Sequence, residues 1–393
     1  MFFALKGGNF NGNKFTEEAL KQGASYAIID EQKYKKNEHY ILVDDVLSTL
    51  QELATYHRKF LNIPIISLTG SNGKTTTKEL INVVLASKYK TTATAGNLNN
   101  HIGVPLTLLS MTNDTEIGIV EMGANHQQEI AFLSKIALPD YGLITNFGKA
   151  HLEGFGSIEA VIKGKSELYD HLKAHHKTIF VNDADTKQIT QAGSYQKLVP
   201  FGALTKLLTS QPYVHLKYKE HIIKTHLTGA YNYNNICVAI AIGNYFKVSD
   251  DNIIGAIENY IPNNNRSQII EKNGHQIILD AYNANPTSMQ AALSNFHQLN
   301  NTHKVAILGD MFELGKEAET EHQSIADYSN NLDFEQVILV GENFYNTKKH
   351  ETISYFTSYD DLKNSFKDFK FDKQMFLIKG SRGMALERVL DLM

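Results

Sequence analysis

Apolar and polar positions alternate along the chain in three stretches, and each stretch predicts strands interleaved with helices. In the first, apolar residues recur at helical spacing in residues 16–24 and 47–60, between extended segments at residues 1–5, 26–30 and 40–46. We expect this first domain, residues 1–62, to be an α/β fragment too small to be stable alone.

The second stretch, residues 63–262, begins with a strand pattern that leads directly into a glycine loop and then a helix. The strand is expected at residues 63–70 and the helix at residues 74–89. Further strands are expected at residues 116–123 and 141–148, and further helices at residues 157–172 and 231–246. Strand, glycine turn and helix follow in the order that a phosphate site requires.

The third stretch, residues 263–393, follows a proline and asparagine cluster at residues 261–265 that reads as a linker. Strands are expected at residues 276–280, 304–310, 336–342 and 375–381, and helices at residues 288–299, 319–329, 359–366 and 384–392. Repeated strand and helix units predict a parallel, doubly wound sheet of the Rossmann-like kind. Ligands of such sheets bind at the carboxyl ends of the strands.

Composition narrows the classes of partner. The 393 residues include 38 basic and 42 acidic side chains without a long run of either sign, so we expect no nucleic-acid partner. The single cysteine, Cys237, excludes an intramolecular disulfide and a metal site built from several cysteines. Because no apolar stretch approaches the roughly 20 residues that cross a bilayer, we expect a cytoplasmic protein without membrane insertion.

The glycine loop lies in the segment LTGSNGKTTTKEL, residues 68–80. Its Gly73, Lys74 and Thr75 match the end of a phosphate loop, but Gly70 precedes Gly73 by only three residues. Glycines let the backbone approach an anion, the helix start offers unpaired amides, and Lys74 adds a positive charge. A glycine turn can also be purely structural, yet this context predicts a nucleoside triphosphate ligand, with the Thr75 hydroxyl available to Mg²⁺.

Other polar residues follow the later strands of the second stretch. Glu121 ends one strand and suits the acidic partner that a magnesium site needs. Asn146 and His151 follow the next strand, where a metal or phosphate role is expected for His151. Lys163 and Lys165 lie two apart on nearly opposite faces of a helix, and their spacing does not choose between them.

Four further residues are candidates for a nucleotide site. Asn232 and Asn235 share one face at the start of an apolar helix, where capping explains one of them without a ligand. Arg266 follows the linker and Asp280 ends a strand, so both are placed to reach a nucleotide held by the second stretch. An arginine suits phosphate, and a carboxylate suits ribose hydroxyls.

The shortened loop, Thr69 to Thr75, resembles that of the Mur ligases, which are ATP-dependent amide-bond ligases that build the peptide of the bacterial cell-wall precursor. The resemblance runs from Phe2 to the end of the chain. It implies a three-domain α/β fold: a partial N-terminal α/β domain, a central P-loop ATPase domain and a C-terminal Rossmann-like doubly wound domain.

Two segments, DAYNANPTSM and LGDMFELG, are similar to the branch of this family that adds D-alanyl-D-alanine to UDP-N-acetylmuramoyl-tripeptide. That likeness implies these two substrates, ATP and Mg²⁺, and a reaction through an acyl phosphate in peptidoglycan synthesis. The alternatives are another ligase on the same scaffold, such as a folylpolyglutamate synthase, and a non-catalytic ATP-binding protein.

The resemblance also implies residue roles. Catalysis would depend on Lys74, Glu121, His151 and Lys165, the last as a carbamylated lysine. Metal binding would use Thr75, Glu121, His151 and Lys165, and nucleotide binding would use Gly70, Asn72, Gly73, Lys74, Thr75, Thr76, Asn235, Arg266, Asp280 and Asn283, with Asn285 on the nucleotide or dipeptide side.

The start of the chain departs from the family pattern. The first domain of Mur ligases normally begins some tens of residues before the segment that matches MFFALKGGNF here. We therefore expect an incomplete first domain and weak turnover of the UDP-linked substrate. The family resemblance implies a monomer. The third residue of the peptide substrate stays open.

Overall fold

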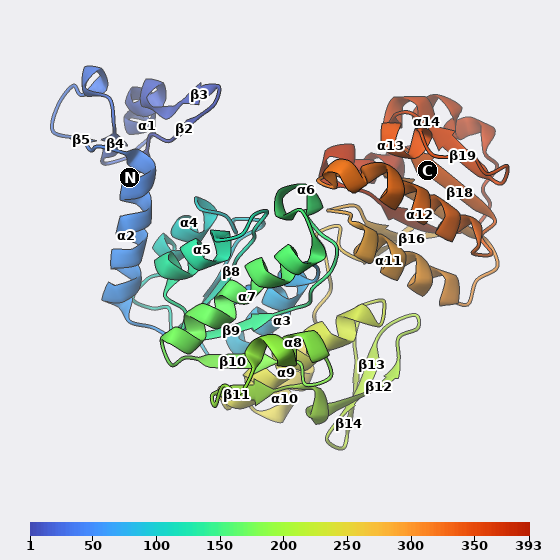
Figure 1. Ribbon diagram of the computed structural model, residues 1–393, viewed down its shortest axis with the longest axis horizontal. Helices are drawn as coiled ribbons and strands as arrows, with labels where there is room; N and C mark the ends of the chain where they lie inside the picture. The colour runs from blue at the N-terminus through green and yellow to red at the C-terminus, as the bar shows by residue number, and fades with distance from the viewer.

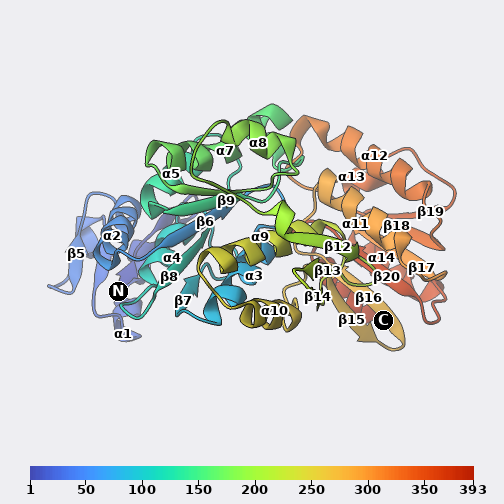
Figure 2. The same ribbon diagram turned by 90° about the horizontal axis from the view of Figure 1, so that it is seen from below.

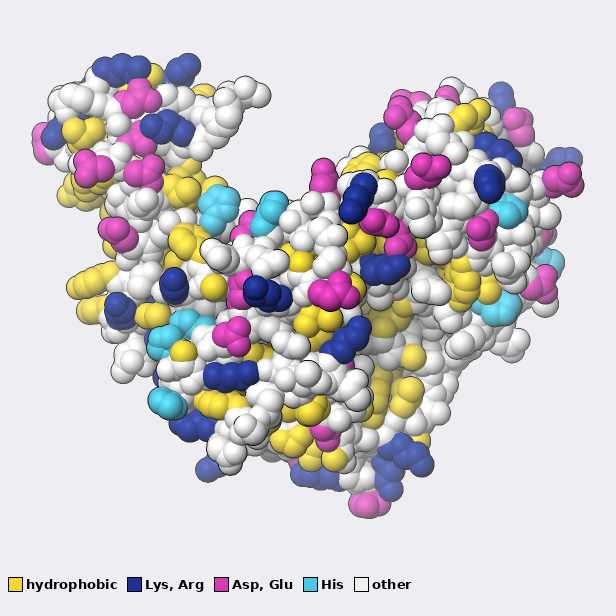
Figure 3. All heavy atoms as spheres, in the orientation of Figure 1, with side chains coloured by type: hydrophobic (Ala, Val, Ile, Leu, Met, Phe, Trp, Pro, Cys, Tyr) yellow, Lys and Arg dark blue, Asp and Glu magenta, His cyan; other side chains and the backbone are white.

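The computed structural model describes residues 1–393 as three α/β units joined in chain order (Figure 1). The first and third units lie on opposite sides of the central one, and a space-filling view shows a wide hollow between them (Figure 3). No helix combines the length and the apolar character that crossing a membrane would take.

The first unit is small. Its strands are β1 (Phe2–Phe3), β2 (Lys6–Gly7), β3 (Phe10–Asn11), β4 (Ala27–Ile29) and β5 (Tyr40–Leu42), and its helices are α1 (Thr16–Lys21) and α2 (Val46–Leu61). Strands β1, β4 and β5 form a parallel sheet in the order β1-β4-β5, while β2 and β3 form a hairpin. The strands expected at residues 1–5, 26–30 and 40–46 are present but shorter than predicted.

Helix α2 joins the first unit to the central one. The Asp45 carboxylate caps its start by accepting from the Ser48 backbone N–H at 2.7 Å, and Asn62 ends it in a left-handed conformation. The guanidinium of Arg58, on its last turn, donates to the Ala137 carbonyl oxygen at 3.1 Å and to Asp140 at 2.7 Å. Helix α2 therefore packs on the central unit although the sequence pattern groups it with the first.

The central unit is built on a six-stranded, fully parallel sheet in the order β11-β10-β9-β6-β8-β7. Its strands are β6 (Ile65–Thr69), β7 (Thr91–Ala93), β8 (Ile117–Glu121), β9 (Tyr141–Ile144), β10 (Thr178–Val181) and β11 (Leu198–Pro200). Its helices are α3 (Lys74–Ala86), α4 (Gly103–Leu109), α5 (Glu129–Ala137), α6 (Leu152–Phe155), α7 (Ile158–Ala174), α8 (Thr186–Ala192), α9 (Tyr231–Tyr245) and α10 (Asp250–Glu258).

Apolar cores cover both faces of this sheet, which explains why β6 and β8 are buried along their whole length. Residues of α3, α9 and α10 pack on one face, and residues of α4, α5 and α7 pack on the other (Figure 2). An antiparallel sheet of β12 (Thr205–Thr209), β13 (His215–Tyr218) and β14 (His221–Lys224) adds to the first of these cores. The sequence pattern did not predict that small sheet, nor β7, β10 and β11.

The third unit has a six-stranded sheet in the order β15-β16-β20-β17-β18-β19. Its strands are β15 (Gln268–Lys272), β16 (His275–Asp280), β17 (Lys304–Gly309), β18 (Gln336–Val340), β19 (Ile353–Phe356) and β20 (Met375–Lys379), and its helices are α11 (Pro286–Gln298), α12 (Ala318–Asn330), α13 (Glu342–Tyr345) and α14 (Tyr359–Ser365). All neighbours are parallel except β15, which forms an antiparallel pair with β16.

The four strands expected in this unit, β16, β17, β18 and β20, are mutually parallel as predicted. An additional strand, β15, forms a hairpin with β16 around Asn273 and Gly274, both in left-handed conformations. The helix expected at residues 384–392 is instead a pair of 3₁₀ segments separated by Ala385, which is itself left-handed. The fold class expected from the sequence is confirmed, and residues 1–62, 63–262 and 263–393 remain our proposed domain division.

Candidate functional site

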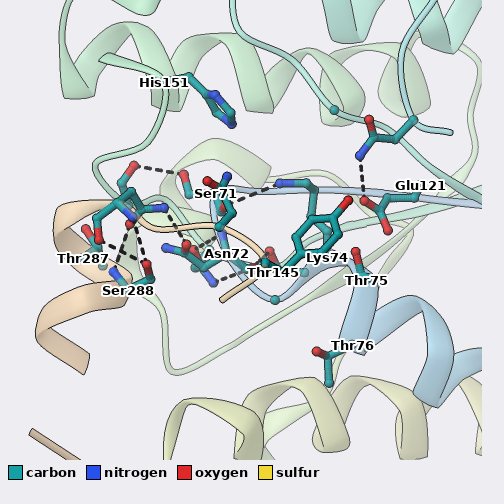
Figure 4. A pocket seen from close by; sticks show the side chains of 18 of the residues that line it. Ser71, Asn72, Lys74, Thr75, Thr76, Glu121, Thr145, His151, Thr287 and Ser288 are labelled. Carbon is teal, nitrogen blue, oxygen red and sulfur yellow. Dashed lines mark hydrogen bonds between the residues drawn. The ribbon is translucent and has the colours of Figure 1, made fainter. Parts of the chain in front are cut away.

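A cavity of about 900 Å³ lies where the carboxyl ends of the central and third sheets meet (Figure 4). The residues around it come from segments that follow β6, β7, β8, β9 and β10 and from the start of α9 in the central unit, from the linker before β15, and from loops that follow β16, β17 and β20 in the third unit. Among the predicted site residues, the following line it: Asn72, Gly73, Lys74, Thr75, Thr76, Glu121, His151, Asn235, Arg266, Asp280, Asn283 and Asn285. Gly70 and Lys165 do not line it directly.

The glycine loop is held by the segment that follows β9. The Asn72 backbone N–H donates to Asn146 Oδ1 at 3.1 Å, and Asn146 Nδ2 donates back to the Asn72 carbonyl oxygen at 2.9 Å. The Thr145 hydroxyl donates to the same carbonyl at 2.6 Å. Gly70, at φ 141°, lies so close that a Cβ there would be 2.0 Å from Thr145 Oγ1. The loop therefore requires glycine at this position, and hydrogen bonds within the protein hold its conformation.

Lys74 begins α3, and its ammonium group curls back over the loop. Its Nζ donates to the Gly70 carbonyl oxygen at 2.7 Å and to that of Ser71 at 3.3 Å. Burial lowers the pKa of Lys74; the charge of Glu121 acts in the opposite direction, and that of Arg266 lowers it further. Lys74 and Arg266 thus repel each other across the cavity, and an anion between them would relieve that repulsion.

Glu121 presents an unsatisfied oxygen at the end of β8. Its side chain is almost completely buried, and its Oε1 accepts from Asn99 Nδ2 at 2.8 Å. Its Oε2 is buried and has no hydrogen-bond partner. A buried carboxylate oxygen without a partner is costly, so this one suits a cation. Thr75 lines the same cavity (Figure 4).

The protein alone supplies few metal ligands here, because no group of three or more His, Cys, Asp or Glu side chains is placed to hold an ion. The available donors are the Glu121 carboxylate, the Thr75 hydroxyl and the His151 ring. The first two are oxygen donors and fit Mg²⁺, which usually binds one or two carboxylates together with phosphate oxygens and water.

His151 links the central and third units. It precedes α6 in a left-handed conformation, and its Nδ1 lies 2.5 Å from Glu313 Oε2 of the third unit. That hydrogen bond is the main cause that lowers the pKa of the Glu313 carboxyl. The Glu153 backbone N–H donates to the Glu313 carbonyl oxygen at 3.0 Å. The position of His151 at the cavity therefore depends on how the two units sit together.

Burial distinguishes the two lysines that spacing left undecided. Lys163 is exposed, whereas Lys165 is completely buried behind the cavity wall, where its Nζ donates to the Ala124 carbonyl oxygen at 2.8 Å. The same Nζ lies 5.0 Å from the centre of the Phe155 ring. Burial, and then repulsion from Lys74, hold the pKa of Lys165 well below its usual value of 10.5. Lys165 is thus the lysine of the pair that is buried and has a lowered pKa.

Asp280 of the third unit is already paired. Its Oδ2 accepts from Lys379 Nζ at 2.6 Å, and its Oδ1 accepts from the Ser267 backbone N–H at 3.2 Å. Lys379 also donates to the Asn283 carbonyl oxygen at 3.2 Å. Sequence reasoning missed Lys379, although it ends the strand MFLIK just as Asp280 ends the strand HQIILD.

Two further polar contacts complete the site. The Arg266 guanidinium stacks on the Tyr282 ring at 3.7 Å, and its Nε is buried without a partner. Asn285 caps α11, and its Nδ2 donates to Asn72 Oδ1 of the glycine loop at 2.7 Å. Glu313, also missed as a site residue, lies in the segment LGDMFELG that the family resemblance singled out.

Comparisons with known proteins identify the family. Residues 68–243 match the Mur ligase middle domain, and residues 265–382 match the Mur ligase glutamate ligase domain. The UDP-N-acetylmuramoyl-tripeptide–D-alanyl-D-alanine ligase of Bacillus subtilis is 35% identical over 99% of this chain and 89% of its own length.

Two solved structures agree with this match. A crystal structure of MurF from Acinetobacter baumannii superposes with a TM-score of 0.85 at 30% identity, covering 99% of this chain and 89% of that one. MurF from Thermotoga maritima in complex with ADP gives a TM-score of 0.87 at 27% identity, covering 99% and 92%. The resemblance inferred from the sequence is confirmed, and the chain belongs to the Mur ligase family and is of the MurF type.

Proposed function

We propose that this protein is the ATP-dependent ligase that joins D-alanyl-D-alanine to UDP-N-acetylmuramoyl-tripeptide in peptidoglycan precursor synthesis. The observation that carries the proposal is the cavity between the two sheets, where the glycine loop, Lys74 and the unpaired Glu121 oxygen face Arg266 and Asp280. The Bacillus subtilis relative with this activity in its name aligns over 99% of the chain.

The reaction requires activation of a carboxylate, because a carboxylate is a poor electrophile. The terminal carboxylate of the tripeptide attacks the γ-phosphorus of ATP, the bond from that phosphorus to the bridging oxygen breaks, and ADP leaves. The amine of D-alanyl-D-alanine then attacks the acyl carbon of the resulting acyl phosphate. The carbon–oxygen bond breaks, inorganic phosphate leaves, and the amine loses a proton as the amide forms.

Each side of the cavity has a distinct part in this chemistry. The loop amides and Lys74 would bind the β- and γ-phosphates and stabilise negative charge that builds on their oxygens. Arg266 would approach the phosphates from the third unit, with Asp280 at the ribose and Asn235, which packs against Gly73, at the adenine. Contacts from both units would keep water away from the acyl phosphate.

Thr75, Glu121 and His151 would hold Mg²⁺ with the phosphates. When bound there, Mg²⁺ supplies charge neutralisation for phosphoryl transfer. Glu313 would keep the His151 ring oriented through its hydrogen bond to Nδ1.

Lys165 would contribute as a carbamate. A primary amine reacts with CO₂ only in its neutral form, and the buried Lys165 amine, whose pKa is held well below 10.5, meets that chemical requirement. The residue would have to reach the cavity past Ala124, to whose carbonyl oxygen it now donates. We further propose that the enzyme is cytoplasmic, and that it is a monomer, since one chain supplies both sides of the cavity.

The test is ADP release by the purified 393-residue chain with ATP, Mg²⁺, UDP-N-acetylmuramoyl-tripeptide and D-alanyl-D-alanine, omitting one component at a time. We expect ADP release to require both the UDP-linked tripeptide and the dipeptide. Release that requires a folate instead would assign the other type of ligase, and nucleotide binding without any turnover would assign a binding protein.

A further inference from the structure

Arg266 has few contacts of its own that fix its position. It forms no ion pair and donates no side-chain hydrogen bond within the protein, and its guanidinium lies on the Tyr282 ring. A long side chain with so little support depends on its backbone for placement. The linker that carries it, between α10 and β15, therefore decides how far Arg266 stands from the glycine loop.

That linker is tied down on its amino-terminal side by Glu79. The Tyr260 hydroxyl donates to Glu79 Oε2, and Asn264 Nδ2 lies 3.1 Å from both carboxylate oxygens. Burial, and then the charge of Glu79, raise the pKa of Tyr260, so its phenol stays protonated as the donor. None of these three residues lines the cavity.

The carboxyl-terminal side of Arg266 is tied separately. The Ser267 backbone N–H donates to Asp280 Oδ1 at 3.2 Å, and the Ser267 hydroxyl lies 2.8 Å from the Tyr231 hydroxyl. Asn265 and Ser267, on either side of Arg266, have φ values of 55° and 50°. Residues other than glycine keep such conformations only where the surroundings impose them, so these contacts set the course of the chain.

Glu79 lies on α3, the helix that starts at Lys74 of the glycine loop. Its position relative to the loop is therefore fixed by a little more than one helical turn. Through Tyr260 and Asn264 it connects the element that holds the phosphates to the linker that carries Arg266.

We propose that Glu79 is a positioning residue that ties the interdomain linker to the phosphate-binding helix and so sets the reach of Arg266 toward the nucleotide. The inference rests on the proposed function, since it requires nucleotide phosphates at the glycine loop. Glu79 does not touch the nucleotide; it acts on binding only through Arg266.

The test is a double-mutant cycle on nucleotide affinity, using a non-hydrolysable ATP analogue with Mg²⁺ and the full chain. Glu79→Ala should weaken binding about tenfold, because three hydrogen bonds to a carboxylate are lost. Glu79→Gln, which keeps an acceptor oxygen, should recover part of the loss. In an Arg266→Ala background, Glu79→Ala should change the affinity by less than about twofold.

The matched control is Glu116→Ala. Glu116 is an exposed carboxylate of the central unit that accepts from the Lys90 backbone N–H at 2.7 Å, away from the cavity, and its removal should leave affinity unchanged. If Glu79→Ala does not fold, as judged by circular dichroism, Tyr260→Phe provides the same cycle with the ring retained and one hydrogen bond removed.

Equal losses from Glu79→Ala with and without Arg266 would overturn the inference, since Glu79 would then act on nucleotide binding by another route. Unchanged affinity in the Glu79→Ala variant would overturn it as well. If the unmodified chain does not bind the analogue at all, the proposed function itself fails, and that result is distinct from the other two.

Discussion

Glu121 in the central unit and Asp310 in the third unit both lie at the carboxyl end of a buried parallel strand, β8 and β17 respectively. Both side chains are almost completely buried. Asp310 accepts from three N–H groups, which are the Asn343 and Phe344 backbone N–H and Asn343 Nδ2, at 3.0 to 3.1 Å. Glu121 accepts from Asn99 alone and leaves Oε2 without a partner.

This difference separates two uses of a buried carboxylate. The Asp310 charge is satisfied by the start of α13, so the fold itself accounts for it. The Glu121 charge is not satisfied within the protein, so the fold bears a cost that a bound cation would remove. At the carboxyl end of β8, the unpaired Glu121 oxygen therefore suits a charged ligand. At the carboxyl end of β17, the paired Asp310 carboxylate stabilises the fold.

The largest effect on the ligase rate is expected from Lys74→Ala in the central unit. Losing the cation at the phosphates should lower the ligase rate about 10³-fold. Folding stability should change little, because the Lys74 hydrogen bonds reach only the carbonyl oxygens of Gly70 and Ser71, in its own loop. The measurement is the initial rate of ADP release together with urea unfolding. A rate within about tenfold of the unmodified enzyme would place the phosphates elsewhere.

Glu121→Gln should lower the ligase rate about 10²-fold while leaving the free energy of unfolding equal or higher. The amide keeps the shape and removes a buried charge whose Oε2 has no hydrogen-bond partner. When the rate is titrated with Mg²⁺, the variant should need a higher Mg²⁺ concentration to reach half of its maximal rate. Loss of stability without loss of rate would show that Glu121 is a structural residue like Asp310.

Asp310→Asn should lower the free energy of unfolding and leave the ligase rate unchanged. Replacing one acceptor oxygen by an NH₂ group in front of N–H donors should cost about 2 kcal/mol of unfolding free energy. The rate per folded molecule should be retained, because Asp310 does not line the cavity. Urea denaturation and the specific rate below the unfolding transition check both statements, and a large fall in specific rate would break the contrast with Glu121.

Glu313→Ala tests the hydrogen bond between Glu313 and His151, which joins the central and third units. Without its partner, the His151 ring should lose its orientation, and kcat should fall about tenfold with a smaller change in the KM for ATP. Glu313→Gln keeps an oxygen acceptor for Nδ1–H and should restore most of the rate. If His151→Ala and the double variant differ in rate by as much as the unmodified enzyme and Glu313→Ala, the two residues act independently.

The smallest effect expected is a pH dependence of the free energy of unfolding that comes from His322 in the third unit. His322, buried near Asp310, accepts from the Met311 backbone N–H, and its Nδ1 lies 2.6 Å from the Ala318 carbonyl oxygen, so the neutral ring satisfies both contacts. Burial lowers the pKa of His322 below its usual 6.5. Below that pH the unfolded chain binds a proton that the folded chain does not, so the free energy of unfolding should decrease as pH falls.

Urea denaturation between about pH 7.5 and about pH 5 measures this dependence, with an expected loss of the order of 1 kcal/mol. A His322→Gln variant should be less stable throughout but should show a shallower decline. An identical pH slope in the variant would assign the dependence to other groups.

Much of this organisation follows from local sequence signals. Runs of buried apolar residues ending in a polar residue located β6, β8, β9, β16, β17 and β20, and a ligand site at their carboxyl ends follows from the rule for parallel sheets. Helical spacing placed Asn232 beside Asn235, and the structure joins them at 2.9 Å. Short edge strands such as β7 and β11 carry too few residues for a periodic signal.

Contacts between residues far apart in the chain were beyond local signals. The Glu313–His151, Asn285–Asn72 and Lys379–Asp280 contacts join residues 99 or more apart in the chain, and no spacing rule reports such pairs. Spacing put Lys163 and Lys165 on different faces, but only packing shows which one is buried. Glu121 and Asp310 have the same sequence signal, and their surroundings alone distinguish them.

The central claim, that the cavity activates a carboxylate by phosphoryl transfer, is tested most directly with oxygen-18. The terminal carboxylate of the UDP-linked tripeptide is labelled, and the phosphate released during ligation is analysed by mass spectrometry. Because the attacking carboxylate oxygen stays on phosphorus when the carbon–oxygen bond breaks, we expect one labelled oxygen in each phosphate. Unlabelled phosphate accompanying amide formation would contradict the account.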